Sequence, residues 1–221
     1  MRTFIINFKN YQEILGERAL ALAKAAETVG KRIEVELVLA PPQPLVGLMA
    51  ERTSLPVFSQ SVSDGATGAT TGLVVPEAVI ASGAVGTLLN HSEARLEKTG
   101  IERLLPRLRE LGLKVCLCAN SEAEAQELAR FGSEYLAVEP PELIGSGIAV
   151  SKARPEVISE SILRTRRAGY QGKVLCGAGI VEGKDVEAAV KLGSAGILVA
   201  SGVVKARNWE EKIAELAAPL V

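Results

Sequence analysis

Eight short apolar segments, each followed by an amphipathic helical pattern, constrain this chain more than any other feature of its sequence. The segments are of strand length, rich in Val, Ile and Leu, and span residues 3–8, 35–40, 56–60, 85–90, 114–119, 134–139, 173–177 and 196–200. Helical patterns follow at 14–29, 43–51, 76–82, 101–111, 122–131, 155–168, 184–192 and 209–217. Such alternation is typical of parallel βα units, and eight units make a closed barrel. The sequence predicts a single α/β domain, a (β/α)8 barrel, over residues 1–221.

Three predicted helices begin with a capping signal. In each, a Ser, Thr or Asn is followed three residues later by Glu: Thr99 with Glu102, Ser121 with Glu124, and Asn208 with Glu211. Pro155 also suits a first helical position, because proline has no N–H group to leave unbonded there.

The rival architecture, a doubly wound open sheet, is normally announced by a glycine-rich turn after the first strand. Here that turn reads Asn-Phe-Lys-Asn-Tyr from residue 7, with no glycine. In a barrel, the loops after the last two strands often bind phosphate. Gly177-Ala178-Gly179 allows backbone N–H groups to approach an anion, and Ala200-Ser201-Gly202 is expected to open a short helix pointing at it. Tight turns alone are the other interpretation of these glycines.

Composition favours a small-molecule partner and a cytoplasmic location. The 25 basic and 26 acidic side chains are mixed along the chain, so no basic stripe suggests nucleic acid or an anionic membrane. No apolar stretch is long enough to span a bilayer, and the N-terminus does not resemble a signal peptide. The three cysteines, Cys116, Cys118 and Cys176, fit buried reduced thiols better than disulfides or a metal site.

Polar side chains end three of the predicted strands. His91, the only histidine, follows strand 85–90 beside a predicted helix start at Ser92. The positive end of a helix there disfavours protonation, which suits a neutral proton donor. Strand alternation puts His91 on one face with Thr87 and Leu89.

The same alternation groups Glu139 with Tyr135 and Ala137, and it separates Asn7 and Lys9 from Phe4, Ile6 and Phe8, which are expected to face helices. Lys9, His91 and Glu139 would then lie at the C-terminal edge of the barrel, where barrel enzymes place their chemistry. Each alone could be a solvated rim or helix-capping residue.

These residues stand in motifs that resemble the triose-phosphate isomerase family. Asn7-x-Lys9, Asn90-His91-Ser92-Glu93 and Val138-Glu139-Pro140 are similar to three family motifs. Ala40-Pro41-Pro42, residues 68–72 and Ile144-Gly145-Ser146-Gly147 match further ones in the same order. The resemblance covers essentially the whole chain. The chain is shorter than the common form of the family, and in this it resembles the archaeal variety. The resemblance implies a TIM barrel without metal or cofactor that interconverts dihydroxyacetone phosphate and D-glyceraldehyde 3-phosphate through an enediolate, in glycolysis and gluconeogenesis.

The resemblance also implies residue roles, which are inherited from the family. Glu139 would be the base, neutral His91 would polarise the carbonyl, and Lys9 would support negative charge. Asn7 would orient Lys9 and contact substrate, with Glu93 behind them. Phosphate would bind backbone N–H groups at Gly145, Gly179, Ala200 and Ser201. Pro140, Pro141 and residues Ile144, Gly145, Ser146 and Gly147 would form a lid over the site, moving on hinges at its two ends.

Several positions depart from the family pattern. Residues 141–143 replace its usual Val-Trp-Ala, and Leu73 and Ala94 replace a Glu and an Arg that can pair, so subunit contacts are expected to be rebuilt. The resemblance implies a homo-oligomer, a tetramer in preference to a dimer, with Thr71 at an interface. Few Asn, Gln and Met residues fit a thermophile.

Two other functions remain open from the sequence. Another sugar-phosphate barrel, such as an epimerase, predicts metal ligands or paired acids at strand ends. A binding protein that has lost catalysis predicts the absence of Lys9, His91 or Glu139, and all three are present.

Overall fold

Eight parallel strands form one sheet that closes into a barrel. The computed structural model describes residues 1–143 and 153–221. The strands are β1 (Thr3–Asn7), β2 (Glu36–Ala40), β3 (Phe58–Ser59), β4 (Gly86–Leu89), β5 (Lys114–Ala119), β6 (Tyr135–Val138), β7 (Lys173–Cys176) and β8 (Gly196–Val199). Their order is β2-β1-β8-β7-β6-β5-β4-β3. A parallel bridge between Leu39 and Val57 joins the two ends, so the ring closes.

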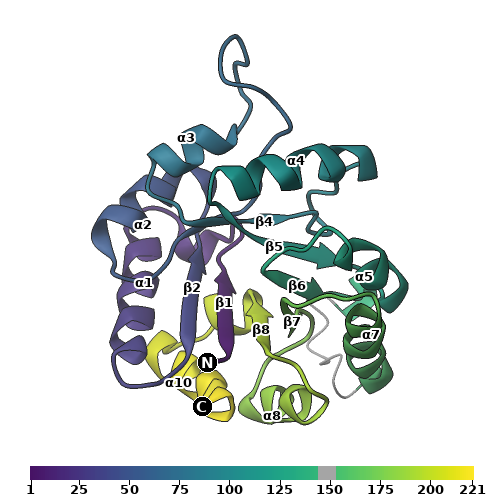
Figure 1. Cartoon of the computed structure of the whole chain (residues 1–221). Coiled ribbons are helices and arrows are strands. Elements are labelled where there is room, and N and C mark those ends of the chain that lie inside the picture. Colours follow the sequence, from purple (N-terminus) through teal and green to yellow (C-terminus); the bar gives the residue numbers. More distant parts are fainter. Residues whose placement is uncertain (144–152) are drawn as a thin grey trace.

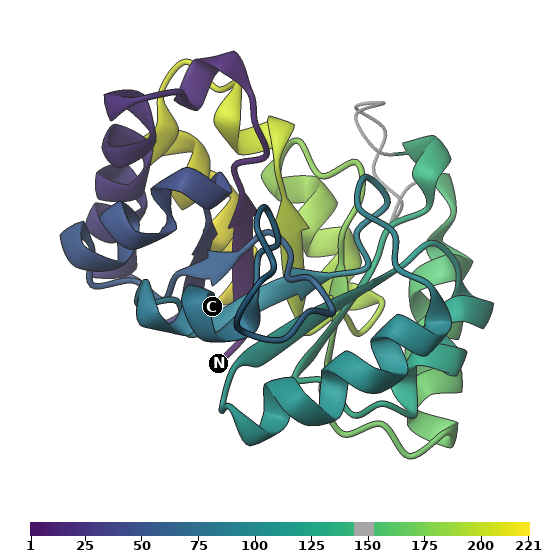
Figure 2. The ribbon, with the colours of Figure 1, turned by 90° about the horizontal axis from the view of Figure 1, so that it is seen from above.

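Helices surround this ring (Figure 1). They are α1 (Glu17–Gly30), α2 (Val46–Arg52), α3 (Pro76–Ala81), α4 (Lys98–Glu110), α5 (Glu122–Ala129), α7 (Pro155–Arg167), α8 (Gly183–Lys191), α9 (Ser201–Val204) and α10 (Trp209–Ala217). Short 3-10 turns occur at Gln12–Ile14, Gln43–Leu45, Pro141–Leu143 and Ala218–Leu220. The predicted (β/α)8 TIM barrel is confirmed. α1 lies beside α10, so the first and last helices meet (Figure 2).

Side chains alternate between two apolar layers, as a strand's period of two requires. Ile5, Tyr135 and Ala137 belong to the cluster inside the barrel. Phe4 and Ile6 pack between the sheet and the helices. The predicted faces of the first and sixth strands are therefore confirmed.

The face predicted for the fourth strand is wrong. Leu88 lies inside the barrel, whereas Leu89 packs against the helices. Regular alternation would then send residue 91 outward. Asn90 interrupts the alternation, because its φ of 60° ends the extended conformation.

Two of the three predicted caps are confirmed. Ser121 Oγ accepts the Glu124 N–H at 3.2 Å, and Asn208 Oδ1 accepts the Glu211 N–H at 3.3 Å. The Thr99 cap is wrong, because α4 begins at Lys98 and places Thr99 inside its first turn.

Polar side chains fill the N-terminal end of the barrel. The Glu36 carboxylate accepts hydrogen bonds from Thr3 Oγ1 at 2.6 Å, Lys173 Nζ at 2.9 Å and the Tyr135 hydroxyl at 2.9 Å. Burial alone would raise the pKa of Glu36, but these hydrogen bonds outweigh burial and lower it. A cavity lies at the opposite end of the barrel, where the strands have their C-terminal ends.

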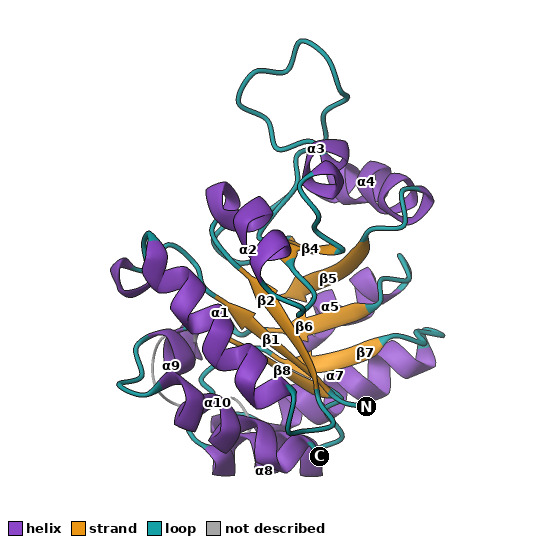
Figure 3. Cartoon of the chain, turned by 90° about the vertical axis from the view of Figure 1, so that its left-hand side faces the viewer, coloured by secondary structure: helices purple, strands orange, loops and turns teal. Residues whose placement is uncertain are grey.

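The segment between β3 and α3 projects away from the barrel (Figure 3). Its neck is closed by the Ser63 N–H, which donates to the Val74 carbonyl at 2.8 Å. Leu73 in this loop is 49% exposed. Among residues 1–143 and 153–221, no helix has the length and apolar character needed to cross a membrane.

Candidate active site

Residues from the C-terminal ends of several strands line one cavity of about 270 Å³. Asn7 and Lys9 come from the end of β1, His91 from β4 and Glu139 from β6. Gly179, Ala200 and Ser201 line the same cavity from the loops after β7 and β8. The structure therefore brings these seven predicted residues together. Glu93 lines a second cavity, which shares Asn7, Lys9 and His91 with the first.

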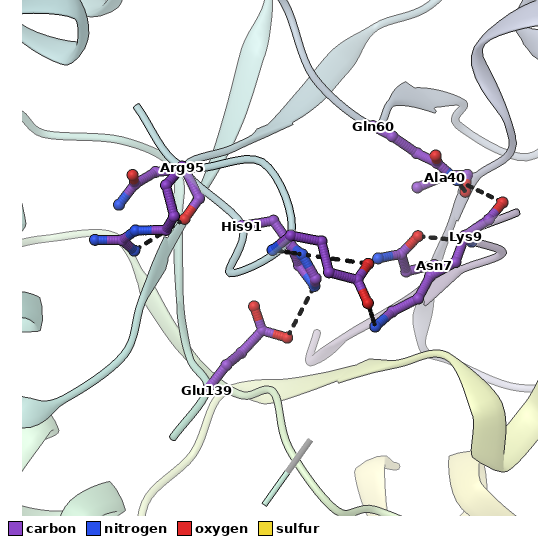
Figure 4. A network of polar contacts seen from close by, with 9 residues as sticks. Asn7, Lys9, Ala40, Gln60, His91, Arg95 and Glu139 are labelled. Carbon is purple, nitrogen blue, oxygen red and sulfur yellow. Dashed lines mark hydrogen bonds and ion pairs between the residues drawn. The ribbon is translucent and has the colours of Figure 1, made fainter. Parts of the chain in front are cut away.

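Glu139 continues the regular alternation of β6 into the cavity. Its side chain is 4% exposed, and its Oε1 lies 3.6 Å from His91 Nε2 (Figure 4). Its Oε2 is buried and has no hydrogen-bond partner among the described residues. A buried carboxylate oxygen without a donor is a suitable proton acceptor for a bound molecule.

The three cysteines are buried, as predicted. Cys118 lies inside the barrel near Glu139. A hydrogen bond with Cys116 raises the pKa of the Cys118 thiol well above its usual range, and burial and the Glu139 charge raise it further. The thiol next to Glu139 therefore stays neutral and adds no second negative charge.

His91 owes its proton arrangement to one backbone group. The Glu93 N–H donates to His91 Nδ1 at 3.1 Å, so this nitrogen carries no proton and Nε2 holds it. The other ring nitrogen, Nε2, faces Glu139. The predicted helix start at Ser92 is wrong, because the chain forms a turn there and α4 begins only at Lys98.

Lys9 is one of two non-glycine residues with positive φ in the described part of the chain, at 48°. Asn7 Oδ1 accepts the Lys9 N–H at 3.0 Å, and Gln60 Nε2 donates to the Lys9 carbonyl at 3.1 Å (Figure 4). Lys9 Nζ pairs with Glu93 Oε1 at 2.7 Å. Asn7 thus orients Lys9, as expected. The contribution of Gln60 was not anticipated, since its partners are remote in sequence.

Glycines and a helix start form the other side of the cavity. Gly179 has φ of 71°, which favours glycine. α9 begins at Ser201, as predicted, so the first N–H groups of this short helix have no acceptor within it. Lys205 also lines the cavity, with its ammonium 4.8 Å from the centre of the Tyr11 ring. Neither Lys205 nor Tyr11 was predicted.

Part of the expected site lies outside the described residues. This applies to the phosphate-binding Gly145 and to the lid residues Ile144, Ser146 and Gly147. Pro140 is buried, and Pro141 begins a 3-10 turn. Within the described residues, no group of three or more His, Cys, Asp or Glu side chains is arranged to hold a metal ion.

The buried Glu139 carboxylate, the His91 imidazole and the Lys9 ammonium line a cavity whose other side is formed by Gly179 and the start of α9. Together with the fold, they define a (β/α)8-barrel enzyme that moves protons on a small phosphorylated carbonyl compound. The family model described as triosephosphate isomerase matches residues 2–217.

Curated relatives match over nearly their whole length. Triosephosphate isomerase of Cenarchaeum symbiosum is 48% identical over 96% of this chain and 95% of its own. Those of Methanocaldococcus jannaschii and Pyrobaculum arsenaticum are each 42% identical, over 96% and 98% of this chain and 97% of their own. The chain belongs to the triosephosphate isomerase family. It is therefore an isomerase, an intramolecular oxidoreductase that interconverts an aldose and a ketose.

Proposed function

We propose that Glu139, His91 and Lys9 catalyse the interconversion of dihydroxyacetone phosphate and D-glyceraldehyde 3-phosphate. The observation that carries this proposal is that Glu139 Oε2 is buried without a hydrogen-bond partner among the described residues, beside a histidine whose Nδ1 accepts the Glu93 N–H and whose Nε2 faces Glu139. A base needs a free lone pair, and a carbonyl needs a donor. Glu139 and His91, which would supply the lone pair and the donor, line the same cavity.

Each side chain then has one task. Glu139 takes a proton from the carbon next to the carbonyl, and His91 Nε2 donates to the carbonyl oxygen as an enediolate forms. His91 moves protons between the two oxygens, and Glu139 returns its proton to the neighbouring carbon. The Lys9 ammonium offsets the negative charge that develops. No atom is lost, so the products are the aldose and the ketose.

The phosphate group is assigned to the glycine-lined side of the cavity. Backbone N–H groups at Gly179 and Ser201, beside Ala200, would bind its oxygens, as helix starts and glycine loops commonly do. Gly145 would add a further donor from the lid.

The test is to replace Glu139 by Gln, which keeps the shape and removes the base. We expect turnover of glyceraldehyde 3-phosphate in a coupled assay to fall on the order of 10³-fold, a typical loss for a general base. Binding of inorganic phosphate, measured by calorimetry, should be retained. Glu134→Gln, at the other end of the same strand, is the matched control. Near-normal turnover in Glu139→Gln would show that another group is the base.

We also infer that the chain acts as a homo-oligomer, a tetramer in preference to a dimer, with Thr71 at an interface. The projecting loop supports assembly, because it exposes Leu73 while its base is fixed to α4 by Arg107, which donates to the Gly65 carbonyl at 2.8 Å. Light scattering should give a mass above that of one chain, and Leu73→Asp should lower it. A monomer in the wild type would refute this inference.

Finally, we regard residues 1–221 as one catalytic domain located in the cytoplasm. Cys116 and Cys118 are buried and form no disulfide, which supports a reducing compartment. Fractionation of cells of the source organism, followed by immunoblotting, tests the location.

A further inference from the structure

The direction in which His91 points depends on a single residue. In β4, Leu88 faces the barrel interior and Leu89 faces the helices, so an extended chain would send residue 91 toward the helices. Asn90 has φ of 60°, and after it the His91 side chain lines the cavity. Asparagine is one of the few residues other than glycine that adopt this conformation routinely.

The Asn90 side chain is bonded at both ends. Its Nδ2 donates to the Cys118 carbonyl on β5 at 3.0 Å, and its Oδ1 accepts the Leu96 N–H at 3.1 Å. Asn90 is 2% exposed, so these bonds do not compete with water. The amide therefore fastens the end of β4 to its neighbour strand and to the turn that follows His91.

A charged pair holds the same peptide from the other side. Arg95 Nη1 donates to the Asn90 carbonyl at 3.2 Å, and Arg95 Nη2 pairs with Glu124. Glu124 also accepts the Asn120 N–H at 2.7 Å, after the end of β5. The peptide that precedes His91 is thus fixed to two structural elements, whereas the imidazole accepts one hydrogen bond among the described residues, from the Glu93 N–H.

We propose that Asn90 is a positioning residue for His91, through both its left-handed backbone and its amide clamp. The inference rests on the role proposed above for His91. A catalytic group held 1 Å from its place can lose about 10²-fold in rate. Substrate binding through the phosphate depends on other strands, so the effect should fall on kcat and not on KM.

Two variants separate backbone from side chain. Asn90→Gly keeps the left-handed conformation but loses the clamp, and we expect kcat to fall about 10-fold. Asn90→Ala loses the clamp and strains the backbone, and we expect a fall of about 10²-fold, the loss that an ångström of misplacement can bring. Asn208→Ala is the matched control, because it removes an asparagine bond to a backbone N–H far from the cavity, at the start of α10.

The single histidine gives a direct readout. With imidazole ¹⁵N labels, the wild type should show one pair of ring signals, with the proton on Nε2. In Asn90→Ala the pair should shift or broaden, while Asn208→Ala should leave it unchanged. Thermal unfolding of each variant shows whether the fold survives, and the Gly variant covers the case in which the Ala variant does not fold.

Unchanged kcat and ring signals in folded Asn90→Ala would overturn the proposal and leave Asn90 a purely structural residue. Wild-type kcat in Asn90→Gly would refute the amide clamp. The variant His91→Gln distinguishes a failure of the proposed function from a failure of the Asn90 proposal. If that variant kept full turnover, the role of His91 itself would be wrong, whatever Asn90 does.

Discussion

Gly177 is expected to control where the Glu139 carboxylate lies, so Gly177→Ala should reduce catalysis without changing any catalytic residue. A Cβ atom at position 177 would lie inside van der Waals contact of Glu139 Cγ, 3.1 Å from its Cδ and 3.2 Å from the Val138 carbonyl oxygen. The last of these neighbours is backbone and cannot yield easily. The Glu139 side chain must therefore move.

The size of the effect follows from that displacement. Restoring ordinary carbon–carbon contact requires a shift of roughly 1 Å. Because a proton transfer depends steeply on the position of the base, such a shift is worth about 10²-fold in kcat/KM. The φ of Gly177 is not in the left-handed region, so backbone strain adds little.

The assay is the coupled isomerisation of glyceraldehyde 3-phosphate, together with thermal unfolding followed by circular dichroism. Gly100→Ala is the matched control. A Cβ there meets no atom within 4 Å, and alanine is favoured over glycine in a helix, so kcat/KM and stability should be retained. If Gly177→Ala folded and kept wild-type kcat/KM, the steric reasoning would be refuted.

Two further predictions concern charged groups. Glu36 has a lowered pKa, so the stability it contributes is present above its unfolded-state pKa and is lost as pH falls through its folded-state pKa. In Glu36→Gln, the melting temperature should therefore depend less on pH between pH 7 and pH 3. An unchanged dependence on pH in this range would contradict the prediction. Lys205→Ala should lower kcat/KM for the phosphorylated substrate several-fold, and less so at high salt, because an exposed cation at the cavity steers a dianion. An equal loss with unphosphorylated glyceraldehyde would show that phosphate is not its target.

Periodicity was enough to predict the barrel, because every strand buries both of its faces and every helix buries one. It predicted element boundaries less well. The segment 56–60 forms only a two-residue strand, Phe58–Ser59. Pro56 begins that segment without an N–H to donate, and Ser59 Oγ bonds to the Ser61 carbonyl at 2.5 Å, so local bonds replace further ladder pairing.

Alternation located side chains correctly only where the strand stayed extended. It succeeded for Glu139, whereas in the fourth strand it grouped His91, which lines the cavity, with Leu89, which packs against the helices. The error cancelled because the left-handed Asn90 turned the chain back. Gln60 was missed for another reason: the carbonyls it binds, at Lys9 and Ala40, are brought near only by the closed sheet.

The two left-handed residues, Lys9 and Asn90, lie within two residues of the ends of β1 and β4. Such conformations cost of order 1–3 kcal/mol each and persist only where neighbours hold them. Here an asparagine holds both, since Asn7 binds the Lys9 N–H and Asn90 clamps its own peptide. Glu139 follows regular geometry and needs space instead, which Gly177 provides. The site is therefore encoded partly by residues that take no part in the proton transfers: Asn7 beside Lys9, Asn90 before His91, and Gly177 against Glu139.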